Sequence, residues 1–502
     1  MSTPNRRVLV LGLDGATFDL LDPWMAAGEL PYLKGLQARG LRAPLRSVYP
    51  PKTIPAWYSF ATGQDPGALG IFGFTEPDGG PGKSRIVQTF RPAEAVWDHL
   101  SRRGVTVGVL NFPVRSAYPI NGFVVPGMLT ENAPTFPDGL RESLERESGH
   151  PYLHELPAYR DAERAAWMDH ATRVVEQYGR WAEILIDRYR PGFLFALFRE
   201  TDRVQHQHWA ELVRPLDEVG EDLKHFFRTV DRTCAQVEQA FRRVGGLSTT
   251  LVISDHGHGA ARSDFFTNRW LAEEGYLVLK RARLGWRRRT VSRLLLGAQR
   301  FGWTRRLVGF AADRLRGGAR REWMGRALTG EGSFESMAAN IDWAKTVAFS
   351  YPVPEGIYLN RYNADLSAER KIQLVGEIRR KLESYAKAKI EVFDPTTLYQ
   401  GRNLAQAPAL LLRIDGMETE SRMDFSYPEP MLRHRPDFFY GSGVHRMDGI
   451  LIAEGDGISG GRRTEPYSLL DVAPTVLEAM GCPIPSAMAG RSFASAFASP
   501  NT

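Results

Sequence analysis

The recurrence of short apolar runs, separated by segments with helical periodicity, constrains the fold of this chain most strongly. Seven runs have the length and composition of buried strands: Val8–Leu13, Val105–Leu110, Gly122–Val125, Phe193–Phe198, Thr249–Ile253, Ala409–Ile414 and Gly449–Ala453. Apolar residues with helical spacing lie between several of them, at Ala93–Arg103, Trp167–Tyr189 and Leu223–Val244. This alternation predicts a three-layer α/β fold, in which helices flank a mostly parallel central sheet.

Composition narrows the class of protein. The 502 residues suffice for a large core, and 43% hydrophobic and 24% charged residues are usual for a soluble globular protein. The two cysteines, Cys234 and Cys482, exclude a disulfide framework and a cysteine-based metal site. Asp14 interrupts the first apolar run too early for a signal peptide, and no stretch is long enough to span a membrane. These features predict a cytoplasmic protein.

Charge divides the chain into a core and an insertion. Residues 280–326 contain fifteen Lys or Arg and two acids, which gives this segment a charge of +13. Because the net charge of the whole chain is +6, the remaining residues together carry −7. We therefore expect a core of residues 1–279 and 341–502, interrupted by a basic helical cap at 280–340. We expect segment 131–164 to be a second, smaller insertion, because it is polar and loop-rich.

Three interpretations of the basic segment remain open. Aromatic residues interleave with its arginines: Trp286, Phe301, Trp303, Phe310 and Trp323. The first interpretation is a solvated cap whose apolar stripe packs on the core. The second is a surface that recognises an anionic substrate or an anionic membrane. Nucleic-acid binding ranks last, because no nucleic-acid-binding motif accompanies the charge.

Acids and histidines gather where the predicted strands end or begin. Asp14 follows the first run, Asp202 and His206 follow Phe193–Phe198, and Asp255 and His256 follow Thr249–Ile253. His445 lies in a Gly-rich loop just before the run that starts at Gly449. Ligands of open α/β sheets bind at the carboxyl ends of the strands, so we expect these side chains to meet there.

These six side chains have the chemistry of metal ligands. Taken singly, an Asp after a strand is often a helix N-cap, and a lone His is more often a satisfied polar residue than a ligand. Taken together, six nitrogen and oxygen donors suit two divalent ions, with zinc as first choice and manganese or iron as alternatives. Two adjacent ions are typical of enzymes that catalyse in-line displacement at phosphorus.

Thr53 is a candidate nucleophile. It stands where a helix is predicted to begin, because Pro55 fits the first turn. Such a helix start binds phosphate, and a metal would activate the hydroxyl. The alternative is that Thr53 only caps the helix. Lys52 either adds positive charge for the substrate or points to solvent.

Five motifs in this order resemble the alkaline phosphatase superfamily: Leu-Gly-Leu-Asp14-Gly, Pro-Pro-Lys-Thr53-Ile-Pro-Ala-Trp, Thr-Asp202-Arg-Val-Gln-His206, Ser-Asp255-His256-Gly and Gly-Val-His445-Arg-Met-Asp-Gly. Within it the chain is most similar to the type I phosphodiesterase/nucleotide pyrophosphatase branch and to predicted phosphohydrolases or phosphomutases. The C-terminal stretches Tyr467–Thr475 and Met488–Arg491 extend the resemblance, which covers nearly the whole chain except the basic segment.

The resemblance implies a role for each motif residue. One zinc would be held by a set that includes the nucleophile: Asp14, Thr53, Asp255 and His256. The other would be held by Asp202, His206 and His445, and would activate the water that hydrolyses a phospho-threonine intermediate.

Some residues depart from the pattern of the branch. Ala56 stands where nucleotide pyrophosphatases carry an Asn that holds a phosphate oxygen, which puts nucleotide specificity in doubt. Asn111 could substitute as a substrate contact, or could equally be a turn residue. His208 and His258 lie beside predicted ligands, and we assign them structural or supporting roles because seven residues already fill two tetrahedral sites.

The sequence thus predicts a two-metal phosphodiesterase that acts on a small-molecule phosphate ester. A phosphomonoesterase or phosphomutase with the same metals is the alternative within enzymes. A non-catalytic relative that binds anionic lipid or a partner is the alternative from another class, and the intact ligand set argues against it.

Overall fold

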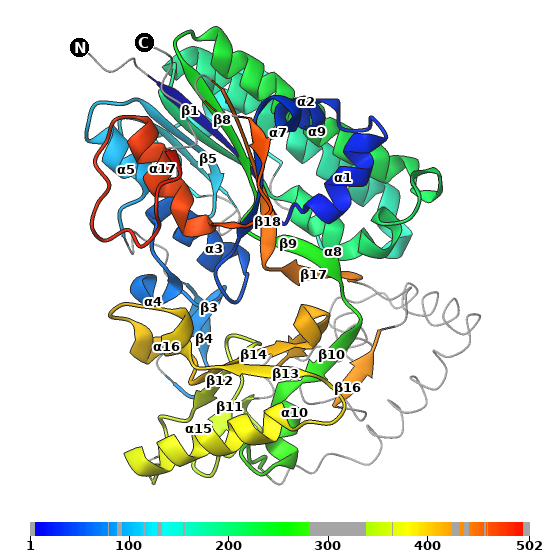
Figure 1. Cartoon of the computed structure of the whole chain (residues 1–502), viewed down its shortest axis with the longest axis vertical. Coiled ribbons are helices and arrows are strands. Elements are labelled where there is room, and N and C mark those ends of the chain that lie inside the picture. The colour runs from blue at the N-terminus through cyan, green and yellow to red at the C-terminus, as the bar shows by residue number, and fades with distance from the viewer. Residues whose placement is uncertain are drawn as a thin grey trace.

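The computed structural model describes residues 6–494 except 79, 88–92, 115, 128–132, 154–155, 281–337, 364, 424–430, 436–440, 456–457 and 459. The chain forms two parts, a large sheet with helices on both faces and a smaller part below it in the view of Figure 1. The basic segment predicted as a helical cap lies almost entirely outside the described residues. Among those residues, no helix has the length and apolar character needed to cross a bilayer.

The large sheet is mostly parallel, as the sequence predicted. Its main strands, in spatial order, are β19 (Gly461–Arg462), β2 (Leu41–Arg46), β18 (Asp448–Gly455), β8 (Ser248–Ile253), β1 (Arg7–Leu13), β7 (Phe193–Phe198), β5 (Val107–Phe112) and β6 (Gly122–Pro126). The five strands from β8 to β6 run parallel, whereas β18 is antiparallel to both β8 and β2. β20 (Tyr467–Ser468) pairs with β2 beside β19.

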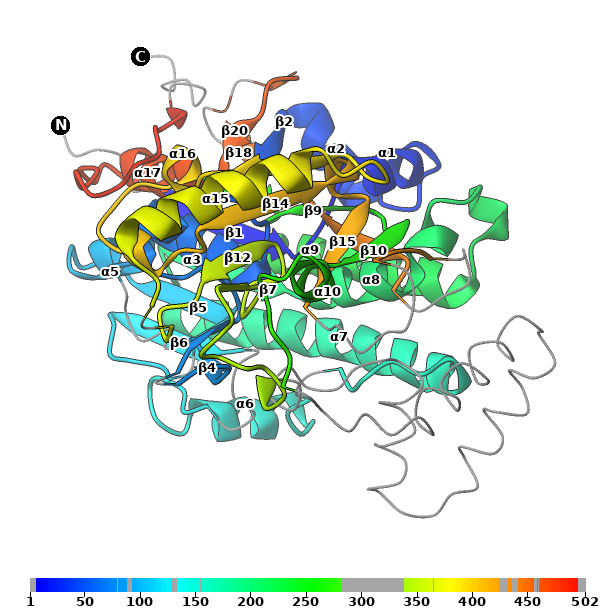
Figure 2. The same ribbon diagram turned by 90° about the horizontal axis from the view of Figure 1, so that it is seen from below.

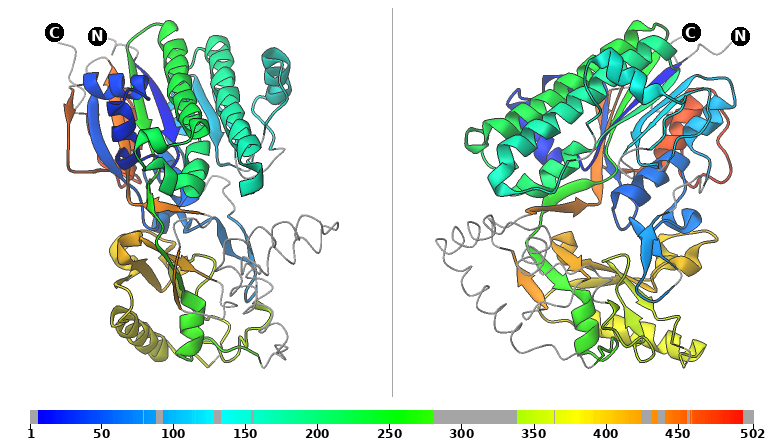
Figure 3. Two further views of the ribbon diagram at one scale, coloured as in Figure 1. Left: turned by 90° about the vertical axis from the view of Figure 1, so that its right-hand side faces the viewer. Right: turned by 180° about the vertical axis from the view of Figure 1, so that it is seen from behind.

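Alternating residues of β1 supply both faces of this sheet with apolar side chains. Leu9, Leu11 and Leu13 pack in the cluster that contains the buried faces of α7 (Arg164–Tyr189) and α9 (Glu221–Arg243). Val8 and Val10 face the opposite cluster, with helices α3 (Thr53–Thr62), α5 (Val96–Ser101) and α17 (Val472–Ala479). Figure 3 shows these two helical layers on opposite sides of the sheet. A strand buried on both faces is therefore apolar along its whole length.

The smaller part is built on its own sheets. One has the order β11 (Ala348–Phe349), β12 (Gly356–Leu359), β14 (Leu410–Ile414) and β13 (Ile390–Phe393), and α15 (Ala368–Glu383) covers its outer side (Figure 2). The other places β10 (Ser263–Phe266) between β15 (Thr419–Arg422) and β16 (Leu432–His434). Helix α10 (Thr267–Glu273) follows β10, and both belong to a separate core cluster with α15.

One predicted boundary differs from this architecture. The run Ala409–Ile414 is a strand, but it belongs to the small sheet, and the chain re-enters the large sheet only at β18 rather than near residue 341. The segment 131–164 includes helix α6 (Leu140–Ser148), whose Leu140 and Leu144 are buried in the cluster that contains α7. An apolar run predicts a buried strand but does not say which sheet receives it.

Candidate metal centre and nucleophile

The predicted ligands from three strands meet at the carboxyl edge of the large sheet. Asp14 follows β1, Asp255 follows β8, and Asp202 lies in the first turn of α8 (Glu200–Leu212), directly after β7. Because these strands are adjacent and parallel, their carboxyl ends share one edge. Two groups of ligand atoms form there, each within 4.8 Å: Asp202, His206, His258 and His445, and Asp14, Asp202 and His256.

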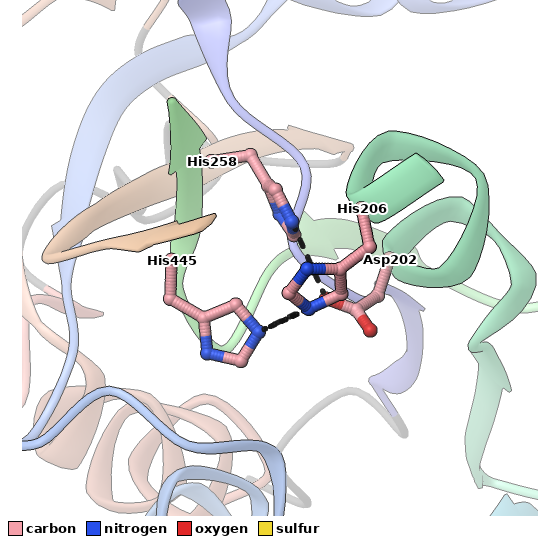
Figure 4. Close-up of side chains that lie close together, drawn as sticks. All are labelled: Asp202, His206, His258 and His445. Atoms are coloured by element: carbon pink, nitrogen blue, oxygen red, sulfur yellow. Dashed lines mark hydrogen bonds and ion pairs between the residues drawn. The ribbon is translucent and has the colours of Figure 1, made fainter. Parts of the chain in front are cut away.

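The first group has the spacing of a tetrahedral site. The Nε2 atoms of His206 and His445 lie 2.9 Å apart, and Oδ1 of Asp202 lies 3.4 Å from the former and 3.2 Å from the latter. Ligands about 2.05 Å from a tetrahedral ion are separated by roughly 3.3 Å. Figure 4 shows these side chains converging on one point. The donor set therefore fits a zinc-like ion.

The second group adjoins the first. Nε2 of His256 lies 3.2 Å from Oδ2 of Asp255 and 3.5 Å from Oδ1 of Asp14. Asp202 belongs to both groups, so its carboxylate stands between them. The ligand atoms of the two groups therefore lie next to each other, as two neighbouring metal ions would require.

Backbone carbonyl groups fix the orientation of the histidine rings. The Nδ1 atom of His206 lies 2.9 Å from the oxygen of Gly443, and that of His445 lies 2.6 Å from the oxygen of Pro51. Nδ1 of His256 is 3.1 Å from the oxygen of its neighbour, Gly257. A carbonyl accepts only, so each Nδ1 carries the proton and each Nε2 presents its lone pair to the cluster.

Several donor atoms are buried without a hydrogen-bond partner in the part of the chain described. They are Oδ1 of Asp14, Oδ1 of Asp202, Oδ2 of Asp255, and Nε2 of both His256 and His258. Buried polar atoms normally have partners, because an unsatisfied one costs about 1–3 kcal/mol. Unpartnered atoms of ligand type that face each other therefore support a metal centre.

Burial also shifts the ionisation of these groups. It raises the pKa of Asp14 and of Asp255 well above the usual range, and the neighbouring carboxylates add to the shift. Burial lowers the pKa of His256 and of His445, so both imidazoles stay neutral near pH 7. Burial opposes ionisation of Asp202 too, but the combined attraction of the neighbouring histidines and Arg203 outweighs it and lowers the pKa of Asp202. Three buried acids beside neutral imidazoles fit a site that takes up cations.

Thr53 lies between residues that contact the two groups. It is the first residue of α3 and is 3% exposed. Two positions before it, the Pro51 carbonyl accepts from His445; one turn after it, Nε1 of Trp57 donates to Oδ2 of Asp14 at 3.0 Å. Lys52, not Thr53, occupies the N-cap position, and its side chain makes no cap hydrogen bond. The hydroxyl is thus not needed to cap the helix.

Lys52 is not directed to solvent, and its ammonium has a carboxylate partner. Its Nζ lies 2.7 Å from Oε1 of Glu355, and its side chain is only 18% exposed. Burial would lower the pKa of Lys52, but Glu355 and then Glu420 raise it above its usual value. The lysine therefore stays charged and joins the segment before the nucleophile to the smaller part of the molecule.

Asn111 has the features of a turn residue. Its backbone is left-handed, with φ of 62°, and its Nδ2 donates to the carbonyl of Leu197 at 2.8 Å. Asn tolerates this region better than most residues. Of the two alternatives from the sequence, this geometry favours the structural one.

His208 packs against Tyr159. The centroids of the two rings lie 5.0 Å apart in a T-shaped contact, in agreement with a structural role for His208.

His258 is a site residue whose part in the cluster was missed from the sequence. It joins the group of Asp202, His206 and His445 (Figure 4). The Gly-rich segment around His445 was expected to be a loop, but Gly443–Arg446 forms strand β17 and pairs with β9 (Gly257–Ala260). The pairing that brings His258 to the site joins residues far apart in the chain, so no local pattern showed it.

Comparison with known proteins places the chain in a family. Residues 8–316 match the family described as type I phosphodiesterase / nucleotide pyrophosphatase. The fold is similar to phosphonoacetate hydrolase from Sinorhizobium meliloti 1021, with 15% identity over 95% of this chain and 96% of that one and a TM-score of 0.52. It is also similar to the alkaline phosphatase PafA, with 13% identity over 99% of both chains and a TM-score of 0.57. No curated protein matches the sequence significantly.

Proposed function

The chain belongs to the type I phosphodiesterase/nucleotide pyrophosphatase family, and we propose on that basis that it is a metal-dependent phosphodiesterase acting on a small-molecule substrate. The observation that carries the proposal is the cluster of buried, unpartnered carboxylate and imidazole atoms beside the start of α3. Each buried ligand atom without a partner lowers the stability of the fold. A protein that only bound lipid or a partner through another surface would gain nothing from keeping so many of them.

Two divalent ions fit the donor atoms. Asp202, His206 and His445 would hold one; Asp14, Asp255, His256 and Thr53 would hold the other. Zinc is the first choice for a nitrogen and oxygen set without cysteine, and manganese or iron are the alternatives. When bound, such ions stabilise the charge that develops on the phosphoryl oxygens and on the leaving group.

Thr53 is the proposed nucleophile. Its hydroxyl oxygen attacks phosphorus, the bond to the leaving alcohol breaks, and the alkoxide takes up a proton to leave as the alcohol. Water then attacks the same phosphorus and releases the monoester, which restores the threonine. Two displacements each have a lower barrier than a single attack by water. The start of α3 supports the anion, because the first turn of a helix has backbone N–H groups without intrahelical partners.

The charge next to Thr53 favours a diester over a monoester. The ammonium of Lys52, the residue adjacent to the nucleophile, is already paired with Glu355. A phosphate diester carries one negative charge, whereas a monoester carries close to two at neutral pH. Because the Lys52 ammonium is already paired, it neutralises less of the second negative charge that a monoester would bring to the nucleophile. A phosphomonoesterase or phosphomutase is therefore the second choice.

Substrate preference tests this proposal. Zinc-loaded protein is compared on bis-p-nitrophenyl phosphate and p-nitrophenyl phosphate, which share a leaving group and differ in charge. We expect kcat/KM for the diester to exceed that for the monoester by about tenfold or more, which corresponds to about 1.4 kcal/mol of discrimination. Faster turnover of the monoester would assign the protein to the phosphatase or mutase class. No turnover with both sites filled would support the non-catalytic alternative.

Asn111→Gly separates a turn role from a substrate contact. Glycine adopts the left-handed backbone freely, so the backbone is not strained, and the substitution removes the buried side chain together with its hydrogen bond to Leu197. We expect the free energy of unfolding to fall by about 1–3 kcal/mol, as for a buried carbonyl left without its donor. We expect kcat/KM for the diester to be unchanged, whereas loss of a donor to the reacting phosphate would lower it about 10²-fold. Denaturant titration and steady-state kinetics on the same variant measure both quantities.

A further inference from the structure

We propose that His258 is a fourth protein ligand at the site of Asp202, His206 and His445, which makes that site a three-histidine, one-aspartate set. The inference rests on the proposed function only in that a metal must bind there. It adds a ligand to the seven residues predicted from the motifs.

The pairing of two short strands aims His258 at the cluster. β9 and β17 run antiparallel, and His445 stands directly opposite His258 in their register. Directly opposed residues in an antiparallel pair project to the same face of the ribbon. Because His445 points to the ligand group, His258 points there too (Figure 4).

The imidazole of His258 is arranged like those of the predicted ligands. Its Nδ1 lies 3.3 Å from the carbonyl oxygen of Gly15, which places the proton on that nitrogen. Its Nε2 lies 3.7 Å from Oδ1 of Asp202 and is buried without a hydrogen-bond partner in the described part of the protein. A histidine that served only packing would not direct a bare, fully buried nitrogen at a carboxylate.

Close packing holds the ring in this orientation. A Cβ atom at Gly15 would lie 2.6 Å from Nδ1 of His258, and one at Gly443 would lie 3.1 Å from its Cδ2. A side chain at position 15 would therefore collide with the ring, and one at position 443 would press on it. On a further side, the ring of Trp209 stacks against it with centroids 6.1 Å apart. The imidazole cannot swing away from Asp202 without displacing these neighbours.

A fourth protein ligand changes the expected behaviour of this site. Catalytic zinc sites usually have three protein ligands and an open position, whereas a fourth protein ligand fills the tetrahedral shell, so a substrate oxygen binds such an ion only by expanding it to five ligands. With His258 included, we expect the ion of this group to be the more tightly held of the two. The other site has three carboxylate or imidazole side chains, Asp14, Asp255 and His256, with the nucleophile Thr53 as its fourth ligand, and we expect it to be the more exchangeable of the two.

The His258→Asn variant tests the assignment. An asparagine amide can still donate to the Gly15 carbonyl, as Nδ1 does, but it has no counterpart of Nε2. Zinc affinity is measured by competition with a chromophoric chelator, and bound zinc is counted by elemental analysis. His225→Asn is the matched control, because His225 is exposed on α9; His206→Asn is the comparison for a predicted ligand.

We expect His258→Asn to lower the affinity of one site by more than about 100-fold, beyond the 10–100-fold typical of residues that only support a ligand. A smaller loss would overturn the proposal. If the variant does not fold, NMR of the wild-type protein decides the matter. With isotope-labelled histidine and an NMR-active cadmium isotope, four imidazole nitrogens should couple to metal; three would overturn the proposal.

These measurements are independent of catalysis. If the wild-type protein binds two ions through four imidazoles yet hydrolyses neither phosphate ester, the proposed function fails and the ligand assignment stands. If the diester is hydrolysed but His258→Asn binds zinc as the wild type does, the ligand assignment fails and the function stands.

Discussion

Thr53→Ala is expected to lower kcat/KM for a phosphate diester by about 10³–10⁵-fold, because removal of a covalent nucleophile removes the low-barrier route through the intermediate. Thr53 is 3% exposed and lies between residues that contact both ligand groups. Alanine is a good helix former, so α3 should persist. The variant should therefore fold and still bind metal through Asp14, Asp255 and His256.

Thr53→Ser provides the matched control. It keeps the hydroxyl and removes only a methyl group, so we expect it to retain much more activity than Thr53→Ala. A second readout follows the phosphorus itself. Hydrolysis of a chiral phosphorothioate diester in isotopically labelled water should proceed with retention of configuration, because two in-line displacements each invert it. Inversion, or wild-type turnover by Thr53→Ala, would contradict a threonine intermediate.

Asp202→Asn is expected to have the second large effect, on metal binding as well as on turnover. Its carboxylate belongs to both ligand groups, with Oδ1 3.2 Å from His445 and 3.4 Å from His206. An amide is neutral and is a weaker ligand than a carboxylate, so both ions lose an anionic neighbour. We expect fewer than two zinc ions per chain after dialysis and a loss of kcat/KM of at least about 10³-fold.

Asp187→Asn is the matched control for this substitution. Asp187 also lies on a helix, near the end of α7, but its side chain is exposed and it belongs to neither ligand group. Its substitution should change neither metal content nor activity. Elemental analysis and steady-state kinetics compare the two variants. Wild-type zinc content in Asp202→Asn would show that this carboxylate is not a ligand.

Much of the site could be predicted because parallel strands impose a shared geometry. Apolar runs identified β1, β7 and β8, and their carboxyl ends had to meet at one edge once the strands paired. Asp14, Asp202 and Asp255 therefore come together from positions far apart in the chain. The spacing of four between Asp202 and His206 placed both on one face of α8.

The remaining features depend on contacts that no local pattern encodes. His258 reaches the site through the pairing of β9 with β17, and both strands have only four residues and neither is an apolar run. Lys52 was left between a substrate contact and a solvent-exposed side chain; its partner, Glu355, comes from the smaller part of the molecule. The strand at Leu410–Ile414 has the same apolar character as the core strands, so its place in a separate sheet could not be read from composition.

Hydrolysis of bis-p-nitrophenyl phosphate before and after metal removal tests the central claim most directly. The protein is stripped with a chelator, its fold is checked by circular dichroism, and zinc is restored stepwise while turnover and bound zinc are measured. We predict no turnover in the stripped protein and full recovery at about two zinc ions per chain, as the ligand count implies. Undiminished turnover in the stripped protein would contradict a metal-dependent phosphodiesterase, as would a folded protein with two bound ions and no turnover.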